Sequence, residues 1–240
     1  MGLMGSKESL YTMQEENNLK MAEHYRNAKP GEIIVFGTYP QWSDGADRTP
    51  IKWRVLQNSG SELFLLSEYL LDSKRYHSDF VDITWRDSDL RKWLNDEFYN
   101  AAFNDSEKRF IKTAHCTDNG EGSTDTEDRI FLLSVSEAKE LTHKLDENSL
   151  GAKRCAIGTE FSKIKKNDGC RLYVYDKKVK DNYITENGEE SGCSWWWLRT
   201  RGNSSSRAFF VGTGSSIRSY GRVSLAYYGV RPALKIDLVL

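Results

Sequence analysis

Two blocks decide the fold: residues 194–199, SWWWLR, and residues 229–234, GVRPAL. Both are rich in aromatic, β-branched and other apolar residues, which predicts buried strands. Three consecutive tryptophans on a strand must alternate between its two sides, so at least one of them belongs to the core. The segment between the blocks, residues 202–228, is rich in Ser, Gly, Tyr and Arg and contains no Lys, Asp or Glu. That composition is typical of an evolved binding surface, because Tyr offers large contact area while Ser and Gly adapt to a partner.

Further strands are predicted outward from these blocks. Residues 58–61 (NSGS) have the composition of a hairpin turn between two apolar runs. The strands that we expect are residues 32–39, 51–56, 63–67, 130–133 and 172–175. We expect the first strand, 32–39, to lie next to the last, 233–238, because an unpaired strand edge is a liability.

A helix over about residues 87–102 is predicted from an apolar stripe at helical spacing, which consists of Leu90, Trp93, Leu94, Phe98 and Ala101. Thr84 and Asp87, three residues apart, are interpreted as its capping box. Shorter helices are expected from about 104 to 112, from a capping box at 134 to about 144, and over 158–165. The remaining segments, 42–50, 68–83, 117–128 and 176–192, have loop or linker composition.

Composition and charge bound the class of protein. The chain has 240 residues and a formal net charge of −1, so no global field attracts it to nucleic acid or to a membrane. No apolar run is long enough to span a bilayer, and the N-terminus lacks the features of a signal peptide. We therefore expect a cytoplasmic or phage-particle-associated protein, with a polar, helical extension over residues 1–29 and one domain over 30–240.

The residues that could carry chemistry are few and scattered. Cys116, Cys155, Cys170 and Cys193 form no C-x-x-C pair, and free thiols are expected, although a disulfide between Cys155 and Cys170 stays open. The four histidines show no metal-binding or catalytic spacing. The acidic loop of Asp118, Asp125, Glu127 and Asp128 lacks the offsets of a calcium site. We expect no catalytic residue, no metal and no cofactor.

Five blocks, in this order, resemble a family of uncharacterised domains that is common in gut Firmicutes and their phages. The blocks are residues 31–41 (GEIIVFGTYPQ), 50–56 (PIKWRVL), 85–95 (WRDSDLRKWLN), 194–199 (SWWWLR) and 229–234 (GVRPAL). Their closing pattern is similar to the end of the C-type-lectin fold of the formylglycine-generating-enzyme type. The resemblance implies an α+β, C-type-lectin-like fold with mixed small sheets, flanking helices and a long loop-rich C-terminal segment.

The same resemblance implies a function. Members of this fold serve as variable proteins of diversity-generating retroelements, in which adenine mutagenesis randomises codons of a C-terminal segment. Asn is frequent in that segment of the relatives, whereas only Asn203 is left here. We therefore expect a non-catalytic ligand-binding protein with a hypervariable surface, a protein or surface glycan as partner, and an undetermined oligomeric state. The alternatives are an ordinary carbohydrate-binding lectin-like module and a formylglycine-generating-type oxidase, although only Cys193 lies near the C-terminal core.

The C-terminal segment supplies the candidate ligand-binding residues. They are Ser204, Ser206, Arg207, Phe209, Phe210, Thr213, Ser215, Arg218, Ser219, Tyr220, Arg222, Ser224, Leu225, Ala226, Tyr227 and Tyr228. We expect little regular secondary structure over 202–228, with Val211, Val223 and Val230 pointing inward. Three arginines without an acid in the same segment predict an outward-facing patch. Its expected members are Phe210, Arg218, Tyr220, Arg222, Tyr227 and Tyr228.

Overall fold

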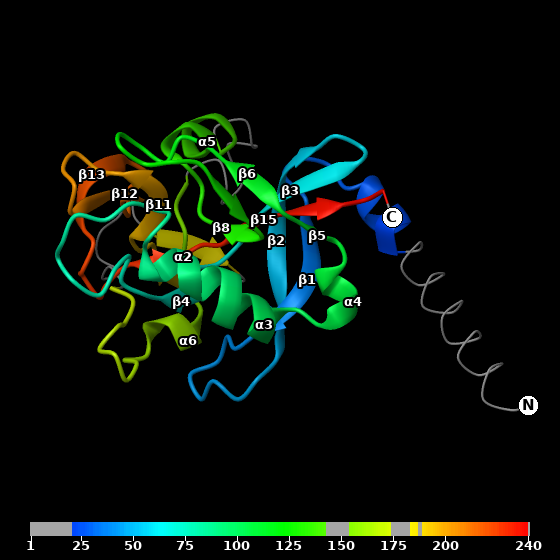
Figure 1. Cartoon of the computed structure of the whole chain (residues 1–240). Helices are drawn as coiled ribbons and strands as arrows, with labels where there is room; N and C mark the ends of the chain where they lie inside the picture. The colour runs from blue at the N-terminus through cyan, green and yellow to red at the C-terminus, as the bar shows by residue number, and fades with distance from the viewer. Residues whose placement is uncertain (1–20, 143–153, 174–182, 187–188, 240) are drawn as a thin grey trace, which may run out of the picture.

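The computed structural model describes residues 21–142, 154–173, 183–186 and 189–239. It has an α+β architecture with two main sheets at opposite ends of the molecule and short helices packed along one side (Figure 1). The first sheet has the order β1-β2-β3-β15-β5, and β8 also pairs with β15. Its strands are β1 (Ile33–Tyr39), β2 (Thr49–Asn58), β3 (Glu62–Ser67), β5 (Ile111–Lys112), β8 (Ile130–Phe131) and β15 (Ala233–Asp237).

The second sheet has the order β13-β12-β11-β14-β4, so β13 is one of its edges. Its strands are β4 (Asp72–Ser73), β11 (Trp196–Arg201), β12 (Arg207–Val211), β13 (Ile217–Arg222) and β14 (Gly229–Val230). Two further pairs are formed by β6 (Ala114–Cys116) with β7 (Thr126–Asp128) and by β9 (Tyr183–Glu186) with β10 (Glu189–Gly192). Residues 196–199 of the block SWWWLR lie in β11, and the block GVRPAL contributes residues 229–230 to β14 and 233–234 to β15, so the two blocks contribute to both main sheets.

The prediction that the first strand, β1, lies next to the last, β15, is wrong, although both belong to the same sheet. β2 and β3 separate β1 from β15, and β15 pairs with β3 from Ala233 opposite Leu66 to Asp237 opposite Glu62. Burial explains this order. Residues 63–67 of β3 are all buried, as a central strand requires, whereas Ile33 and Val35 of β1 are exposed, as an edge permits.

The predicted long helix is confirmed as a continuous helical segment whose middle is a π-helix. It consists of α2 (Asp89–Trp93), η1 (Leu94–Phe98) and α3 (Tyr99–Ala102). Leu90, Leu94 and Phe98 are buried as the stripe predicts, but the prediction is wrong for Ala101, which is exposed, and Trp93 is only half-buried. The cap was assigned wrongly: Ser88 is the N-cap, because its side chain accepts a hydrogen bond from the Arg91 N–H.

The shorter helices are α4 (Asp105–Lys108), α5 (Val135–Glu140) and α6 (Glu160–Lys163), each shorter than expected. Ser134 and Glu137 do form the predicted capping box of α5. α4 ends early because Ile111 and Lys112 pair with β15 in the first sheet. In the N-terminal extension residues 21–26 are helical, and residues 1–20 lie outside the described part.

Three segments expected to be irregular contain strands. Residues 202–228 form the β12–β13 hairpin, residues 183–192 include the β9–β10 pair, and β7 closes the predicted loop of residues 117–128. Side-chain composition misled the prediction at all three, because backbone pairing can be adopted by Ser-rich and Gly-rich chain when neighbouring strands supply partners. Conversely, Leu172 and Tyr173 are not in a strand, and the rest of the strand expected at 172–175 lies outside the described residues.

Both arginines of the opening blocks are buried and hold the sheets together. Arg199 pairs with Glu137 of α5 and donates to the Asn119 side chain over 2.9 Å. Arg231 donates to the Ser67 carbonyl of β3 over 2.8 Å, and its guanidinium lies 5.2 Å from the Trp196 ring centroid. Burial lowers the pKa of Arg231 to about 10.

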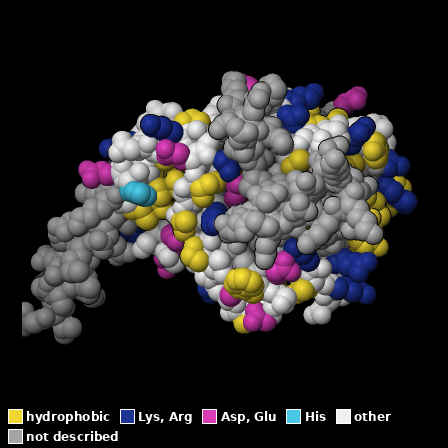
Figure 2. All heavy atoms as spheres, turned by 180° about the vertical axis from the view of Figure 1, so that it is seen from behind, with side chains coloured by type: hydrophobic (Ala, Val, Ile, Leu, Met, Phe, Trp, Pro, Cys, Tyr) yellow, Lys and Arg dark blue, Asp and Glu magenta, His cyan; other side chains and the backbone are white. Residues whose placement is uncertain are grey.

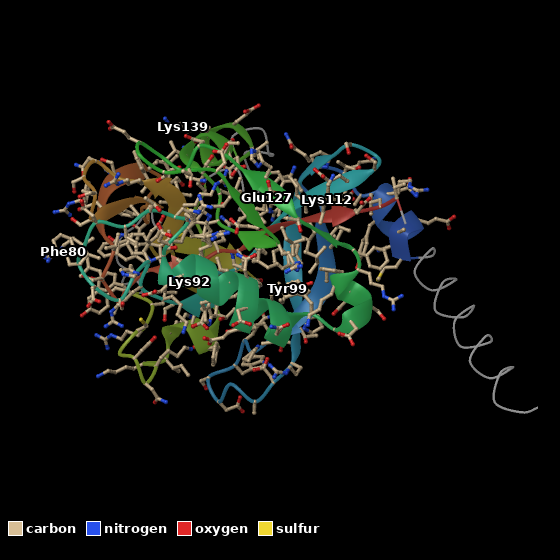
Figure 3. All side chains as sticks on the ribbon, in the orientation of Figure 1. Phe80, Lys92, Tyr99, Lys112, Glu127 and Lys139 are labelled. Carbon is tan, nitrogen blue, oxygen red and sulfur yellow. The ribbon has the colours of Figure 1, made fainter. Side chains whose placement is uncertain are left out.

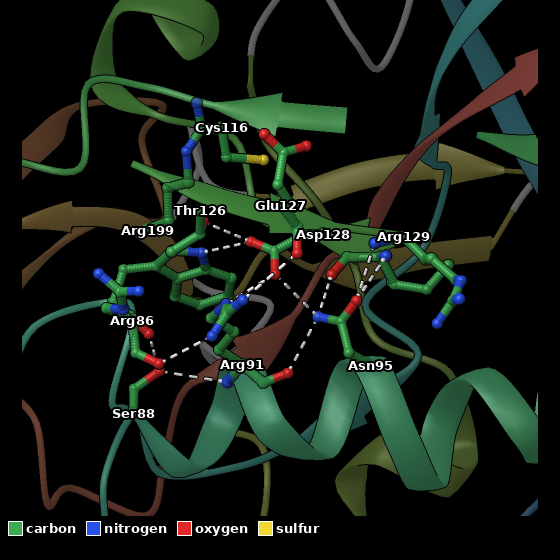
Figure 4. A network of polar contacts seen from close by, with 12 residues as sticks. Arg86, Ser88, Arg91, Asn95, Cys116, Thr126, Glu127, Asp128, Arg129 and Arg199 are labelled. Carbon is green, nitrogen blue, oxygen red and sulfur yellow. Dashed lines mark hydrogen bonds and ion pairs between the residues drawn. The ribbon is translucent and has the colours of Figure 1, made fainter. Parts of the chain in front are cut away.

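A second polar network anchors the helix to the strands (Figure 4). The fully buried Asp128 carboxylate accepts from the Trp85 indole over 2.9 Å, from the Thr126 hydroxyl over 2.7 Å and from Arg91 over 2.6 Å. Asn95 adds a bond to the Ile130 carbonyl over 2.8 Å. Arg91 and Asn95 of block 85–95 therefore tie the helical segment to β7 and β8.

Candidate binding surface

The β12–β13 hairpin carries the candidate site. Its turn closes where the Gly212 N–H donates to the Ser216 carbonyl over 2.8 Å, and Ser215 there has a φ of 65°. β13 lies close to the core because Gly221 has no side chain: a Cβ there would meet the Trp197 ring at 2.6 Å. Glycine at this position therefore sets how tightly the edge strand packs.

Alternation along β13 determines which side chains face solvent. Arg218, Tyr220 and Arg222 are all exposed, with Tyr220 at 52%, while the residues between them are buried or half-buried. Successive side chains of a strand point to opposite faces, so these three share one face. Tyr227, 40% exposed, follows β13 by five residues. We call Arg218, Tyr220, Arg222 and Tyr227 the hairpin face.

Four of the sixteen candidate residues are buried and cannot contact a ligand directly: Phe210, Thr213, Ala226 and Tyr228. Only five are exposed: Ser204, Arg218, Tyr220, Arg222 and Tyr227. The other seven are half-buried: Ser206, Arg207, Phe209, Ser215, Ser219, Ser224 and Leu225. Val211, Val223 and Val230 are buried, as predicted.

The misassignment of Phe210 and Tyr228 has a simple cause. Each is one member of an aromatic pair, and the strand and the turn direct one member inward and the other outward. Tyr228 stacks on Trp197 with ring centroids 3.8 Å apart and contacts Phe210 at 5.0 Å. Burial, followed by the proximity of Tyr220, raises the pKa of Tyr228 to about 12.

These rings belong to a continuous aromatic layer that reaches the surface at both ends. Tyr173 stacks on Trp195 at 5.2 Å, Trp195 contacts Phe210 at 6.2 Å, and Phe210 contacts Tyr220 at 5.4 Å. Tyr173 is 46% exposed, and its N–H donates to the Tyr227 carbonyl over 3.2 Å. Tyr173 thus adjoins the hairpin face, although sequence reasoning had assigned it only to a strand.

Sequence reasoning also missed the loop of residues 77–83. Its Ile83 N–H donates to the Ser205 carbonyl over 3.1 Å, and Asp82 bonds the Ser205 hydroxyl, so the loop is tied to the hairpin. Phe80 and Val81 are exposed, and Phe80 projects from the edge of the molecule (Figure 3). The Arg222 guanidinium lies 4.3 Å from the Phe80 ring centroid. The sequence feature that could have identified this loop is the apolar pair Phe80-Val81 between Asp79 and Asp82.

The hairpin itself carries arginines and no acid, whereas the adjoining loop of residues 77–83 carries Asp79 and Asp82. Arg207 donates to the Tyr220 carbonyl over 2.7 Å and Arg218 to the Ser216 hydroxyl over 3.0 Å. Neither these two nor Arg222 lies within ion-pair distance of a carboxylate among the residues that the structure describes. Dark blue side chains gather at the right edge in Figure 2, the end of the molecule where Figure 1 places β13.

All four cysteines are buried and none of them is in a disulfide, so the Cys155–Cys170 disulfide is not formed. The structure does bring Cys155 against Cys193, an arrangement that their spacing of 38 positions had not indicated. The thiol–thiol hydrogen bond with Cys155, followed by burial, raises the pKa of Cys193 far above its ordinary value. Burial likewise raises the pKa of Cys116 to about 12. All these shifts disfavour thiolates.

The acidic loop is dispersed rather than gathered. The Asp128 carboxylate belongs to the buried network described above. The Asp118 carboxylate accepts a hydrogen bond from the Ser136 N–H. Asp125 and Glu127 both lie beside His115. Over the described ranges, no three His, Cys, Asp or Glu side chains form a group able to hold a metal ion.

A cavity of about 370 Å³ lies elsewhere, beside α2 and η1. Its lining mixes the Trp93 ring with charges of both signs, among them Lys74, Asp96 and Asp168. The Lys74 ammonium lies 5.0 Å from the Trp93 ring centroid and 3.8 Å from the Asp168 carboxylate, so cations inside it already have partners.

Residues 60–238 match a family described as "Domain of unknown function (DUF6273)". No curated protein and no solved structure matches the chain. In the described part of the chain, no helix has both the length and the apolar character needed to cross a membrane.

Proposed function

The chain belongs to the DUF6273 family, and from that premise we propose that it is a non-catalytic binding protein whose ligand contacts the hairpin face. The single observation that carries the proposal is the exposure of Arg218, Tyr220 and Arg222 on one face of an edge strand. Tyr and Arg are the residues that dominate binding energy at interfaces, so an exposed face that combines them is suited to hold a partner.

We propose a C-type-lectin-like scaffold for this surface. Its support is the α+β architecture and the order of the sequence blocks. The buried arginines and tryptophans of these blocks are Arg54, Arg199, Arg231, Trp53, Trp85, Trp196 and Trp197. The proposal includes diversification of the C-terminal segment by a retroelement, restricted to the residues that reach solvent. The hairpin supports this restriction, since its frame is held by Gly221, Val211 and Tyr228 and not by the exposed side chains.

The binding proposal is tested with a paired variant. Tyr220→Ser combined with Tyr227→Ser removes two exposed rings, and Trp42→Ser is the matched control because Trp42 is 62% exposed in the loop between β1 and β2. The three immobilised proteins are exposed to candidate cell-surface proteins and glycans, and the bound molecules are quantified by mass spectrometry. A ligand that the wild type and the Trp42 variant retain and the double variant loses supports the proposal. A ligand retained equally by all three contradicts it.

Diversification is tested in the flanking DNA. The expected result is a near-copy of the segment that encodes residues 202–228, differing mainly at adenines, beside a reverse-transcriptase gene. Related genomes that keep the exposed codons unchanged would contradict diversification while leaving the binding proposal intact.

An oxidase is the second candidate, because Cys155 lies against Cys193. Cysteine oxidation needs an accessible thiolate, whereas both thiols are buried and the pKa of Cys193 is raised by its hydrogen bond and by burial. We therefore rank it second. Oxygen consumption with a cysteine-containing peptide, lost on Cys193→Ser, would reverse the ranking.

A further inference from the structure

The hairpin face has a regular spacing. Arg218, Tyr220 and Arg222 occupy every second position of β13. A strand rises about 3.3–3.4 Å per residue, so the two guanidinium-bearing residues lie about 13 Å apart with the tyrosine midway. A ligand that contacts all three groups must repeat its own contacts with the same period, which an extended peptide does.

The electrostatic environment specifies the sign of that ligand. Three further arginines lie beside Arg218 and Arg222 at the hairpin. The Arg207 and Arg154 side chains donate hydrogen bonds to the Tyr220 and Ser215 carbonyls. The backbone N–H of Arg171 donates to the Ala226 carbonyl. None of these arginines has an ion-pair partner among the described carboxylates. The hairpin segment, residues 202–228, contains three arginines and no Asp or Glu, so its own charge is positive. A partner with carboxylates would meet complementary charge.

We infer that the partner is an acidic protein segment in an extended conformation, which lies along β13 with one carboxylate on Arg218 and a second, four residues away, on Arg222. The inference rests on the proposed binding function and adds the chemical class of the partner. A guanidinium binds a carboxylate through paired N–H groups, which gives direction as well as charge.

Apolar contacts distinguish a peptide from an anionic polysaccharide. Between the arginines lies Tyr220, 52% exposed, and Phe80 beside Arg222 is 44% exposed. An acidic peptide can place an apolar side chain between two carboxylates and cover the tyrosine, whereas a sulfated sugar supplies charge with little apolar surface to bury. Aromatic and arginine contacts at the centre of such a patch are the ones that stabilise complexes.

The test uses four fluorescein-labelled probes and fluorescence anisotropy. The first is the heptapeptide Thr-Glu-Thr-Val-Thr-Glu-Thr, whose two glutamates match the spacing. The second has the same composition with the glutamates adjacent, the third has lysines in place of the glutamates, and the fourth is a heparin tetrasaccharide. We expect the first to bind most tightly, and binding to weaken as salt rises.

Charge-reversed variants connect binding to the hairpin. Arg218→Glu with Arg222→Glu should weaken binding of the first peptide about tenfold or more, since like charges then face each other. Arg109→Glu, an exposed arginine after α4, should leave binding unchanged. If the reversed variant melts at a lower temperature than wild type, Arg218→Gln with Arg222→Gln provides the same comparison without new charge.

Three results would overturn the inference: equal binding of the two acidic peptides, stronger binding of heparin than of the matched peptide, or no loss on replacing both arginines. Each of these leaves the proposed function standing if the Tyr220 and Tyr227 variant still loses its ligand. Retention of that ligand by the tyrosine variant would instead refute the proposed function itself.

Discussion

Truncation of Tyr228 tests whether the buried aromatic residues stabilise the fold while the exposed residues of the hairpin face do not. Tyr228 is 3% exposed, stacks on Trp197 at 3.8 Å and contacts Trp195 and Phe210 at 5.5 and 5.0 Å. Emptying a buried aromatic site costs about 3–5 kcal/mol, and each aromatic pair adds about 0.5–1.5 kcal/mol beyond area burial. Tyr228→Ala should therefore lower the free energy of unfolding by at least about 3 kcal/mol.

Tyr220→Ala provides the contrast, because Tyr220 is 52% exposed and its ring contacts Phe210 at its edge. Its cost should stay within about 1 kcal/mol, as for most surface changes. For a domain of this size, 1 kcal/mol corresponds to about 2–4 °C, so Tyr228→Ala should lower the Tm by about 6 °C or more and Tyr220→Ala by less than about 4 °C. The assay is thermal unfolding followed by near-ultraviolet circular dichroism, with urea unfolding as a check on the free energies.

The control is Tyr228→Phe, which keeps the ring and should keep most of the stability. If Tyr228→Ala unfolds like wild type, the stack on Trp197 is not part of the core and the frame described above is wrong. By the same reasoning, a triple replacement of Tyr220, Tyr227 and Tyr228 by Ser should destabilise the protein through Tyr228, the buried residue of the three. It is therefore unsuitable as a test of binding.

Three further outcomes are expected. Phe98→Ala should lower the free energy of unfolding, measured in urea, by about 3–5 kcal/mol because Phe98 is buried. Trp93→Ala should lower it by less, because Trp93 is only half-buried. Equal losses in the two variants would contradict this difference in burial. Partial burial opposes ionisation of Asp47, but hydrogen bonds from Thr49 and from backbone N–H groups outweigh it and hold the pKa at about 2. This pKa is depressed, so the stabilisation is present above about pH 4 and disappears as the pH falls toward 2; Asp47→Asn should flatten the acid limb of the Tm–pH curve, and an unchanged limb would refute it. Finally, Cys155 and Cys193 should react with a thiol reagent only slowly in the native protein and rapidly in guanidinium, because both are buried; rapid native labelling would show the pair to be accessible.

Periodicity predicted the elements whose burial is one-sided or complete. The apolar stripe of Leu90, Leu94 and Phe98 predicted the helix, and the apolar run at residues 63–67 predicted the strand β3. In both cases the spacing of apolar residues in the sequence follows directly from which side chains are buried. The strand order of the first sheet was not predictable in the same way. It depends on which strand can bury both faces, and β1 displays exposed Ile33 and Val35 that its apolar sequence conceals.

The sequence predicted which segment carries the candidate site but not which side chains of that segment are exposed. Composition identified the segment, because three arginines without acids must reach solvent, and Arg218 and Arg222 do so. Composition carries no information about which member of a Phe-Phe or Tyr-Tyr pair points inward. Phe80 and Tyr173 were missed because they join the surface through tertiary contacts, far from the segment in sequence.

The same burial pattern limits how a diversified version of this chain can vary. Phe210 and Tyr228 form the inner part of the aromatic layer, and Gly221 admits no side chain without meeting Trp197. Random replacement at these positions would create cavities or clashes of several kcal/mol, comparable to the stability of a whole domain. Replacement at Arg218 or Tyr220 meets no such penalty, because these side chains project from an edge strand into solvent. A binding protein built on this hairpin can therefore exchange its ligand contacts one by one while the aromatic layer beneath them keeps its shape.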